Sequence, residues 1–486
     1  MRHFWRIGVF AAAMMTASIA AWLWFRPIPE GLQTPLSGTL TLVDCHDREI
    51  AEVASIEARA QIPVELGAMG EWLPRVTVAI EDHRFYRHAG IDGRATLAAF
   101  IRNLQSGRVI SGGSTITQQL IKLASNRRHR SWLGKLGEAF AAWNLERRWG
   151  KERILSEYLN RLNYGNRRLG PEAAARAYFG KSARTMTLAE AIFLAGLPQS
   201  PTRFNPWRHA DSANRKYGRS VQRLARLGII TPDQQAVLRQ SLPVAQRFDP
   251  PRHAPHFVDA LRAQHPTMTG RVTTTLDLEL QASAEQTLRT HLAALNRYDV
   301  TQAAIVVLDN ASGAVEAMVG SSDYDLAQTN GATRPRSAGS TLKPFVYLAA
   351  IDRQVLTAAS LLPDTSDAIR GEYRDYDPHN FSRRYLGPVR VREALGCSLN
   401  VPAIMALSRI GARSAFYELR KWGFDFPGTL EDYGAGFILG NAEIRLIDLA
   451  AAYAGLARGG LAMHARCCKF EQLPLARIAS TEATAI

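Results

Sequence analysis

The distribution of hydrophobic residues sets one segment near the N-terminus apart. Residues 7–25 carry no charged side chain over 19 positions, close to the roughly 20 apolar residues that span a bilayer as a helix. Arg2 and Arg6 precede this segment, which predicts a cytoplasmic tail over residues 1–6 and an extracytoplasmic location for all that follows. A cleaved signal peptide is the alternative, but the apolar run continues to Phe25, beyond an ordinary signal core. We expect an uncleaved transmembrane anchor.

The next pattern predicts a short β-linker and then a long helical region. Prolines at 27 and 29 end the membrane helix, and residues 38–43 (GTLTLV) alternate like a strand. We therefore expect a β-linker over residues 26–60. Apolar residues then recur at helical spacing, over residues 95–104, 136–149, 151–159 and 188–197. This predicts an all-α domain over residues 61–225.

A third pattern begins at Arg271, after an expected linker over residues 226–270. The segment RVTTTLDL is rich in β-formers, and residues 278–295 have helical spacing. Residues 304–308 and 314–319 are expected to form two strands joined by a turn. Strands that alternate with helices predict an α/β domain over residues 271–486.

Composition and charge narrow the possible partners. A chain of 486 residues suits two or three domains, and its net charge of +15 favours nucleic acid, phospholipid headgroups or a phosphorylated substrate. The sequence contains no zinc-ligand spacing, RNA-binding signature or P-loop. Together with the anchor, this favours the plasma membrane and a lipid phosphate over nucleic acid, and no metal-ligating side chains are predicted. The four cysteines form no disulfide framework and are expected to be unpaired.

The most informative stretch for chemistry runs from Glu81 to Leu120. It begins with the adjacent carboxylates of Glu81 and Asp82 in EDHRFYRHAGID, and it continues with SGGSTITQQL. A carboxylate beside cations and a glycine-rich turn suits an acid/base group next to an anion site.

These two segments resemble the first two motifs of the peptidoglycan glycosyltransferase domain of class A penicillin-binding proteins. Three further motifs follow in the family's order, at residues 135–138 (KLGE), 151–160 (KERILSEYLN) and 173–181 (AAARAYFGK). The general layout is most similar to the penicillin-binding protein 1C subgroup. The resemblance implies a lysozyme-like all-α fold that polymerises lipid II into a nascent glycan strand.

The resemblance also assigns roles at the first site. Glu81 would be the main acid/base residue and Glu138 the second carboxylate. The expected substrate-binding residues are Gly113, Ser114, Thr115, Gln118, Lys122, Lys135 and Lys151. The three lysines are our candidates for the lipid pyrophosphate. No cofactor is established by the sequence, and a divalent cation such as Mg²⁺ at the pyrophosphate is the one candidate.

Two features of this domain leave alternatives open. The family usually has arginine before the motif lysine, whereas Gly134 precedes Lys135 here, so one contact to the leaving group is in doubt. Residues 95–110 correspond to a segment that enters the outer leaflet in the family, and the alternative is an amphipathic helix packed on the core. The arginines at 127–130 suit either a membrane-facing or a solvated patch.

A second site is predicted in the α/β domain. Ser340 and Lys343 match the S-x-x-K pattern of penicillin-binding proteins, and Ser398 and Asn400 match the S-x-N element. On a helix, positions i and i+3 share a face, so Lys343 could reach the Ser340 hydroxyl. The resemblance implies a serine acyltransferase of β-lactamase-like fold, which a β-lactam could acylate at Ser340.

No K-T-G or similar triplet follows Asn400. In the family that strand borders the active-site cleft and contributes to the oxyanion site. We therefore expect an incomplete transpeptidase domain with impaired acyl transfer.

Two other functions remain open from the sequence. A lysozyme-like hydrolase could cleave the same glycan, although the anchor and the basic residues favour a lipid substrate. A catalytically inactive scaffold that recruits other cell-wall synthesis proteins is the third interpretation, which the intact Glu81 and GGST turn disfavour for the first domain.

Overall fold

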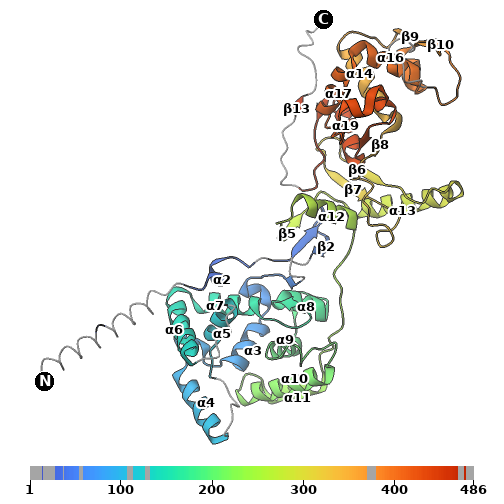
Figure 1. Cartoon of the computed structure of the whole chain (residues 1–486). Helices are drawn as coiled ribbons and strands as arrows, with labels where there is room; N and C mark the ends of the chain where they lie inside the picture. The colour runs from blue at the N-terminus through green and yellow to red at the C-terminus, as the bar shows by residue number, and fades with distance from the viewer. Residues whose placement is uncertain are drawn as a thin grey trace. The chain divides into compact units, whose positions relative to one another are not determined.

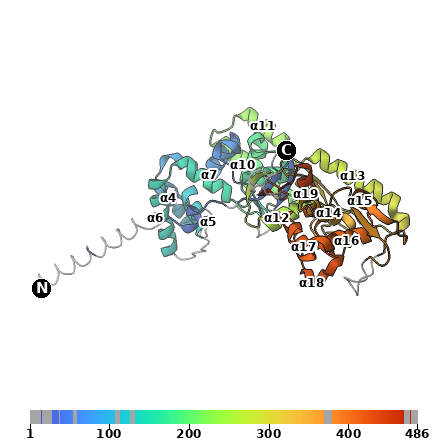
Figure 2. The same ribbon diagram turned by 90° about the horizontal axis from the view of Figure 1, so that it is seen from above.

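The chain folds into two compact units in a computed structural model, which describes residues 14, 28–36, 38–53, 59–106, 113–125, 132–368, 379–468 and 476–477. The N-terminal unit comprises Met1–Leu40 and Glu52–Pro250, and the C-terminal unit comprises Thr41–Ala51 and Pro251–Ile486. Figure 1 and Figure 2 label the elements of each unit. Apart from Met14, the expected anchor lies outside the described residues. Within the ranges that are described, no helix combines the length and apolarity needed to cross a membrane.

The N-terminal unit is helical, as the spacing of its apolar residues predicted. Its helices are α2 (Glu30–Gln33), α3 (Trp72–Glu81), α4 (Gly93–Ser106), α5 (Ile116–Ala124), α6 (Trp132–Arg148), α7 (Lys151–Arg161), α8 (Pro171–Phe179), α9 (Leu188–Gly196), α10 (Ala210–Arg226) and α11 (Pro232–Gln240). Three short 3₁₀ turns lie at Leu66–Met69, Phe85–Arg87 and Ala183–Thr185. A small parallel pair joins β3 (Ala60–Gln61) to β4 (Arg168–Leu169).

The core of this unit surrounds α3. Residues 76–80 of α3 are all buried, and the helix packs against α9 and α10, while α5 packs against α6 and α7. A helix buried on most of its surface holds its last residue, Glu81, in a fixed position.

The C-terminal unit combines small sheets with helices. A three-stranded sheet has the order β2 (Glu49–Val53), β1 (Leu40–Val43), β5 (Gly270–Thr273). The hairpin predicted from the sequence is present as β6 (Ile305–Leu308) and β7 (Val315–Val319), which pair antiparallel with an irregularity at Val307/Leu308. The helix α13 (Leu278–Leu295) packs on β7, and α19 (Leu446–Ala457) packs on β6.

The remaining elements of this unit form a second helical core and short strand pairs. The helices are α12 (Pro255–Gln264), α14 (Lys343–Asp352), α15 (Val391–Gly396), α16 (Asn400–Ile410), α17 (Ala412–Lys421) and α18 (Leu430–Tyr433), with 3₁₀ turns at Asn296–Tyr298, η5 (Gly339–Leu342) and Gly434–Leu439. The strand pairs are β8 (Arg336–Ser337) with β11 (Glu443–Ile444), β9 (Leu361–Asp364) with β10 (Gly387–Arg390), and β12 (Leu461–Ala462) with β13 (Ala476–Arg477). Because α14 packs on both α16 and α17, the start of α14 lies beside the start of α16.

Candidate active sites

The carboxylate of Glu81 stands at the end of α3 and is oriented by an amide. Gln119 of α5 donates from Nε2 to Glu81 Oε2 at 3.2 Å. The Oε1 atom of Gln119 in turn accepts from the buried Tyr158 hydroxyl at 2.9 Å. Burial, with the charge of Glu81 nearby, raises the pKa of Tyr158 well above its usual value, so this phenol remains a neutral donor. The chain Tyr158–Gln119–Glu81 therefore fixes the carboxylate from one side.

A second cluster brings together two residues predicted to bind substrate, Ser114 and Lys135, and the predicted second carboxylate, Glu138. Lys135 of α6 donates from Nζ to Glu138 Oε2 at 3.1 Å and to Ser114 Oγ at 3.3 Å. The Glu138 side chain is 8% exposed, whereas that of Lys135 is 58% exposed. Lys135 can therefore turn toward a bound anion, while Glu138 stays in place.

Thr115 and Gln118, also predicted to bind substrate, form the N-terminal cap of α5. The Gln118 N–H donates to Thr115 Oγ1 at 3.2 Å, and the Thr115 N–H donates to Gln118 Oε1 at 2.9 Å. The Thr115 hydroxyl also donates to the Gly90 carbonyl at 2.7 Å. Such a capping box satisfies otherwise unpaired helix donors. The structure thus gives both side chains a structural task, and their contact with substrate stays a prediction.

Asp82 and His88 connect the end of α3 to the same helix start. Asp82 Oδ2 lies 3.0 Å from His88 Nε2 and accepts the Ile116 N–H at 3.1 Å. Asp82 is buried, and a carboxylate suits the positive end of a helix. The Asp82 carboxylate therefore joins the first motif to the second through the Ile116 N–H.

Of the other predicted residues, Lys151 is the most constrained. Its Nζ lies 2.7 Å from Glu146 Oε2, donates to the His88 carbonyl at 2.7 Å, and lies 4.4 Å from the centre of the Phe85 ring. Lys122 is exposed on α5. At Gly113 a Cβ atom would come within 2.7 Å of Thr96 Cα, so only glycine allows the turn to lie this close to α4.

In the C-terminal unit, Lys343 forms the centre of the second site. It is 1% exposed at the start of α14, and its Nζ donates to the Ser398 carbonyl at 2.7 Å, to Ser398 Oγ at 3.3 Å and to Asn400 Oδ1 at 2.7 Å. Burial lowers the pKa of Lys343 to about 8. A buried lysine with a lowered pKa is suited to accept a proton near neutral pH.

Ser340 lies in η5, one turn before Lys343, and it is exposed. Within the described parts of the chain, no hydrogen bond joins it to Lys343. The amine of Lys343 is instead directed to Ser398 and Asn400. Ser398, in contrast, has a left-handed backbone with φ of 52°, a strained conformation that aims its hydroxyl and carbonyl at the lysine.

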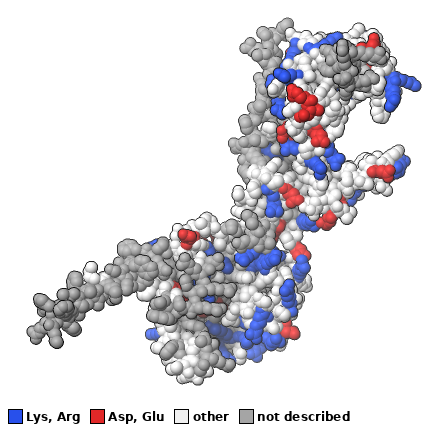
Figure 3. Space-filling model, in the orientation of Figure 1, with Lys and Arg blue, Asp and Glu red and all other residues white. Residues whose placement is uncertain are grey.

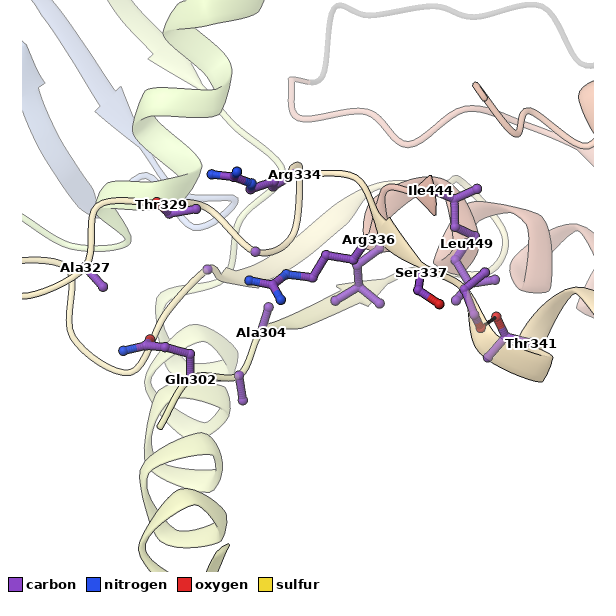
Figure 4. Close-up of a pocket in the computed structure, with 15 residues that line it drawn as sticks. Gln302, Ala304, Ala327, Thr329, Arg334, Arg336, Ser337, Thr341, Ile444 and Leu449 are labelled. Carbon is purple, nitrogen blue, oxygen red and sulfur yellow. Dashed lines mark hydrogen bonds between the residues drawn. The ribbon is translucent and has the colours of Figure 1, made fainter. Parts of the chain in front are cut away.

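Two buried side chains, those of Asn380 and Asp364, hold the backbone of Asn400. Its N–H donates to Asn380 Oδ1 at 2.8 Å, and Asn380 Nδ2 lies 2.8 and 2.9 Å from the two oxygens of the fully buried Asp364. A cavity of about 380 Å³ is lined by Ser337 of β8 and by Thr341 of η5. In Figure 4 the Arg336 side chain extends along this cavity toward Ala304. The turn that carries Ser340 therefore has an open side.

Comparisons with known proteins match both units of the chain. A family model described as Transglycosylase matches residues 46–225, and one described as Penicillin binding protein transpeptidase domain matches residues 303–468. Penicillin-binding protein 2D of Bacillus subtilis (strain 168) is 30% identical, over 95% of this chain and 68% of the relative. The chain belongs to the class A penicillin-binding proteins.

Other members of the family are also similar to this chain. Penicillin-binding protein 1C of Escherichia coli (strain K12) is 32% identical over 93% of this chain. A crystal structure of penicillin-binding protein 1A from Haemophilus influenzae has a similar fold, with a TM-score of 0.55 and 21% identity over 90% of this chain and 70% of that one. This penicillin-binding protein spans 58% of the length of the E. coli relative and 59% of penicillin-binding protein 1F of B. subtilis.

Sequence patterns did not identify two further side chains at the first site of this penicillin-binding protein. Gln119 was visible in the second motif, but nothing distinguished it from Gln118. Lys216 of α10 is half-buried and donates to Gln199 Oε1 at 2.6 Å; burial lowers its pKa, and the charge of Glu81 opposes that shift. Its proximity to Glu81 depends on how α10 packs on α3 and α9, which no local motif encodes.

The described residues contain few clusters of side chains that could bind a metal ion. One group of three donor side chains comes close together, namely Cys45, His46 and Asp277 of the C-terminal unit. Arg48 Nη2 already lies 3.0 Å from Asp277 Oδ1, so this carboxylate has a cation. In the described part of the N-terminal unit no comparable group converges, and Glu138 is bonded to Lys135. These residues do not fit a magnesium cage, and the chemistry proposed below uses the lysines.

Proposed function

We propose that this chain is a peptidoglycan glycosyltransferase, which joins lipid II molecules into glycan strands during cell-wall synthesis. The single observation that carries the proposal is the fixed Glu81 carboxylate, held by Gln119 on one helix, in the same unit as the Lys135–Glu138 pair. A positioned base and a mobile cation are the two groups that transfer of a sugar from a pyrophosphate requires.

The proposed reaction proceeds by displacement at the anomeric carbon. Glu81 takes the proton of the acceptor sugar's 4-hydroxyl, and the resulting oxygen forms the new glycosidic bond. The bond between the anomeric carbon and the pyrophosphate breaks, and its electron pair leaves with the pyrophosphate. Lys135 and the exposed Lys122 neutralise the charge that develops there. Lys151, with both Glu146 and His88 as partners, positions the first motif more than it binds phosphate.

A second activity, acyl transfer at Ser340, is supported by the contacts of Lys343. In its neutral form Lys343 can accept a hydrogen bond from the Ser398 hydroxyl, so a proton from Ser340 can reach the amine through Ser398. Asn400 holds the amine in place through its Oδ1 atom at 2.7 Å. The acyl donor would be a peptide stem of the glycan strand, and a β-lactam would be its analogue.

The protein is proposed to act at the plasma membrane, with residues 7–25 as a single anchor and the catalytic units outside the cytoplasm. Support comes from Arg2 and Arg6 before an uncharged segment. It comes also from α4, on which Leu97, Ile101 and Leu104 are 60%, 46% and 73% exposed at helical spacing. Figure 3 shows Lys and Arg gathered over α10 on one face of the N-terminal unit, a charge that suits anionic lipid. Other cell-wall synthesis proteins are proposed partners.

Polymerisation of lipid II by the purified full-length chain in detergent tests the main proposal. We expect long glycan strands to form from the starting lipid. A muramidase, when added, should break these strands down. Release of short soluble sugars from preformed glycan, with no strand formation from lipid II, would instead support the hydrolase alternative.

A further inference from the structure

A basic cavity of about 570 Å³ lies in the N-terminal unit, between the loop that follows α7 and the loop that precedes α10. Four cationic or ionisable side chains line it, namely Arg59, Arg167, Arg208 and His209. Among the described residues no carboxylate lines it, and neither Glu81 nor Glu138 borders it. The cavity is therefore a positively charged space outside the proposed acid/base site, and its volume is typical of a small-ligand pocket.

Two asparagines build a rigid floor for this cavity. Asn205 Nδ2 donates to Asn166 Oδ1 at 2.7 Å, and Asn166 Nδ2 donates to the Tyr178 hydroxyl at 3.1 Å. Asn205 is buried, and its Oδ1 accepts the backbone N–H groups of Trp207 at 3.0 Å and Arg208 at 3.3 Å. These bonds fix both loops before any ligand arrives, so little conformational entropy would be lost on binding.

The first loop stores backbone strain next to its arginine. Gly165, Asn166 and Arg167 are consecutive left-handed residues, with φ of 90°, 48° and 61°. A non-glycine residue in this conformation is strained, and such residues gather at functional sites. Asparagine tolerates the conformation, but arginine has no intrinsic reason to adopt it. This strained backbone thus places the charged side chain of Arg167 in the cavity lining.

Two of these arginines lack an anionic partner in the structure. Other arginines of the N-terminal unit pair with carboxylates, as Arg75 does with Glu71 and Arg84 with Asp92. No ion pair to Arg167 or Arg208 occurs within the described residues. A guanidinium presents parallel donors that match a carboxylate or phosphate, so two of them on one concave wall suit a single anionic group.

We infer that this cavity binds a carboxylate on the peptide stems of the glycan strand, an inference that rests on the proposed function for the identity of the ligand. Lipid phosphate offers similar charge, but a headgroup layer is flat, whereas this anion must enter a cavity. The amide and hydroxyl groups of Asn163 and Thr202 on the lining can also pair with a peptide backbone. The site would hold the strand while Glu81 acts elsewhere in the unit.

The test measures binding of a soluble disaccharide-pentapeptide, without lipid or pyrophosphate, to the full-length chain. The double variant Arg167→Asn/Arg208→Gln removes both charges and keeps a residue that accepts the left-handed backbone. We expect the affinity to fall about tenfold or more, since each lost charged hydrogen bond is worth about one factor of ten. Amidation of the probe's carboxyl groups should weaken its binding to the unaltered chain. The loss should equal that seen when the probe with free carboxyl groups binds the double variant. Arg75→Gln, an exposed arginine of the same unit, is the matched control and should change nothing.

Three results would overturn the inference. The double variant could bind the free probe as tightly as the unaltered chain, amidation of the probe could have no effect, or the variant could lose binding to anionic phospholipid vesicles instead. If the double variant melts at a lower temperature, the single variant Arg208→Gln replaces it in the binding measurement. Glu81→Gln separates the two proposals, because it should keep probe binding. In the unaltered chain, probe binding without polymerisation of lipid II would contradict the proposed function and support the cavity, and polymerisation without probe binding would do the reverse.

Discussion

In each of the two candidate sites, neighbouring side chains hold one reactive residue in position. Glu81 depends on the Gln119 amide, which depends on Tyr158, and Lys343 depends on Ser398 and Asn400. Ser398 and Asn400 came from a recognisable motif, as the reactive groups did, whereas the contact of Gln119 with Glu81 is set by tertiary packing. Preorganised partners of this kind determine how much a positioned base contributes.

The lowered pKa of Lys343 gives a pH prediction for the second site. The amine must be neutral to accept a proton, and its neutral fraction rises as the pH rises through about 8. The rate of Ser340 acylation by a fluorescent penicillin should therefore increase about tenfold per pH unit below 8 and level off above it. Lys343→Arg, which stays charged, should lose the reaction, and Ser340→Ala is the control for labelling elsewhere. A rate that does not change between pH 6 and pH 9 would contradict the role of Lys343.

At the scale of elements, the start of α5 links the first two motifs. Its cap is Thr115, its first N–H bonds to Asp82, and its Gln119 reaches Glu81. Damage to this helix start should therefore affect both stability and the carboxylate.

Thr115→Ala tests whether this residue acts as a cap. Loss of an N-cap costs about 1 kcal/mol, and the Gly90 carbonyl also loses its donor. We expect a lower denaturation midpoint for the N-terminal unit, with stability restored in Thr115→Ser. The measurement is urea unfolding followed by tryptophan fluorescence. Unchanged stability together with lost binding of lipid II would show that Thr115 contacts the substrate instead.

The sequence predicted local elements well and long-range pairing poorly. The range 278–295 is α13 to the residue, and the expected strand pair is β6 and β7, because hydrophobic spacing is a local property. Pairing of β1 with β5 was not predicted, since more than two hundred residues separate them and no periodicity sets that register. The approach of Lys216 to Glu81 was missed for the same reason, whereas the cap made by Thr115 and Gln118 is a local pattern that was not among the predictions.

At the scale of the whole molecule, the charge and the N-terminal segment make one prediction about location. The anchor at residues 7–25 and the cations at Arg2 and Arg6 favour a cytoplasmic N-terminus. A periplasmic reporter fused after Ile486 should be active in cells, and the same fusion with residues 7–25 deleted should not be. Activity of a cytoplasm-specific reporter at that position would contradict the proposed topology.

The central claim is that Glu81 is the base that activates the acceptor sugar, and Glu81→Gln tests it most directly. This change keeps the shape of the side chain and its place beside Gln119 but removes the group that accepts the proton. Glu71→Gln, an exposed glutamate at the other end of α3, is the matched control. The quantity measured is the initial rate of glycan formation from lipid II in detergent. We predict that the rate falls by a factor of about 10² or more in Glu81→Gln and is unchanged in Glu71→Gln, with equal melting temperatures. Full polymerisation by Glu81→Gln would contradict the account.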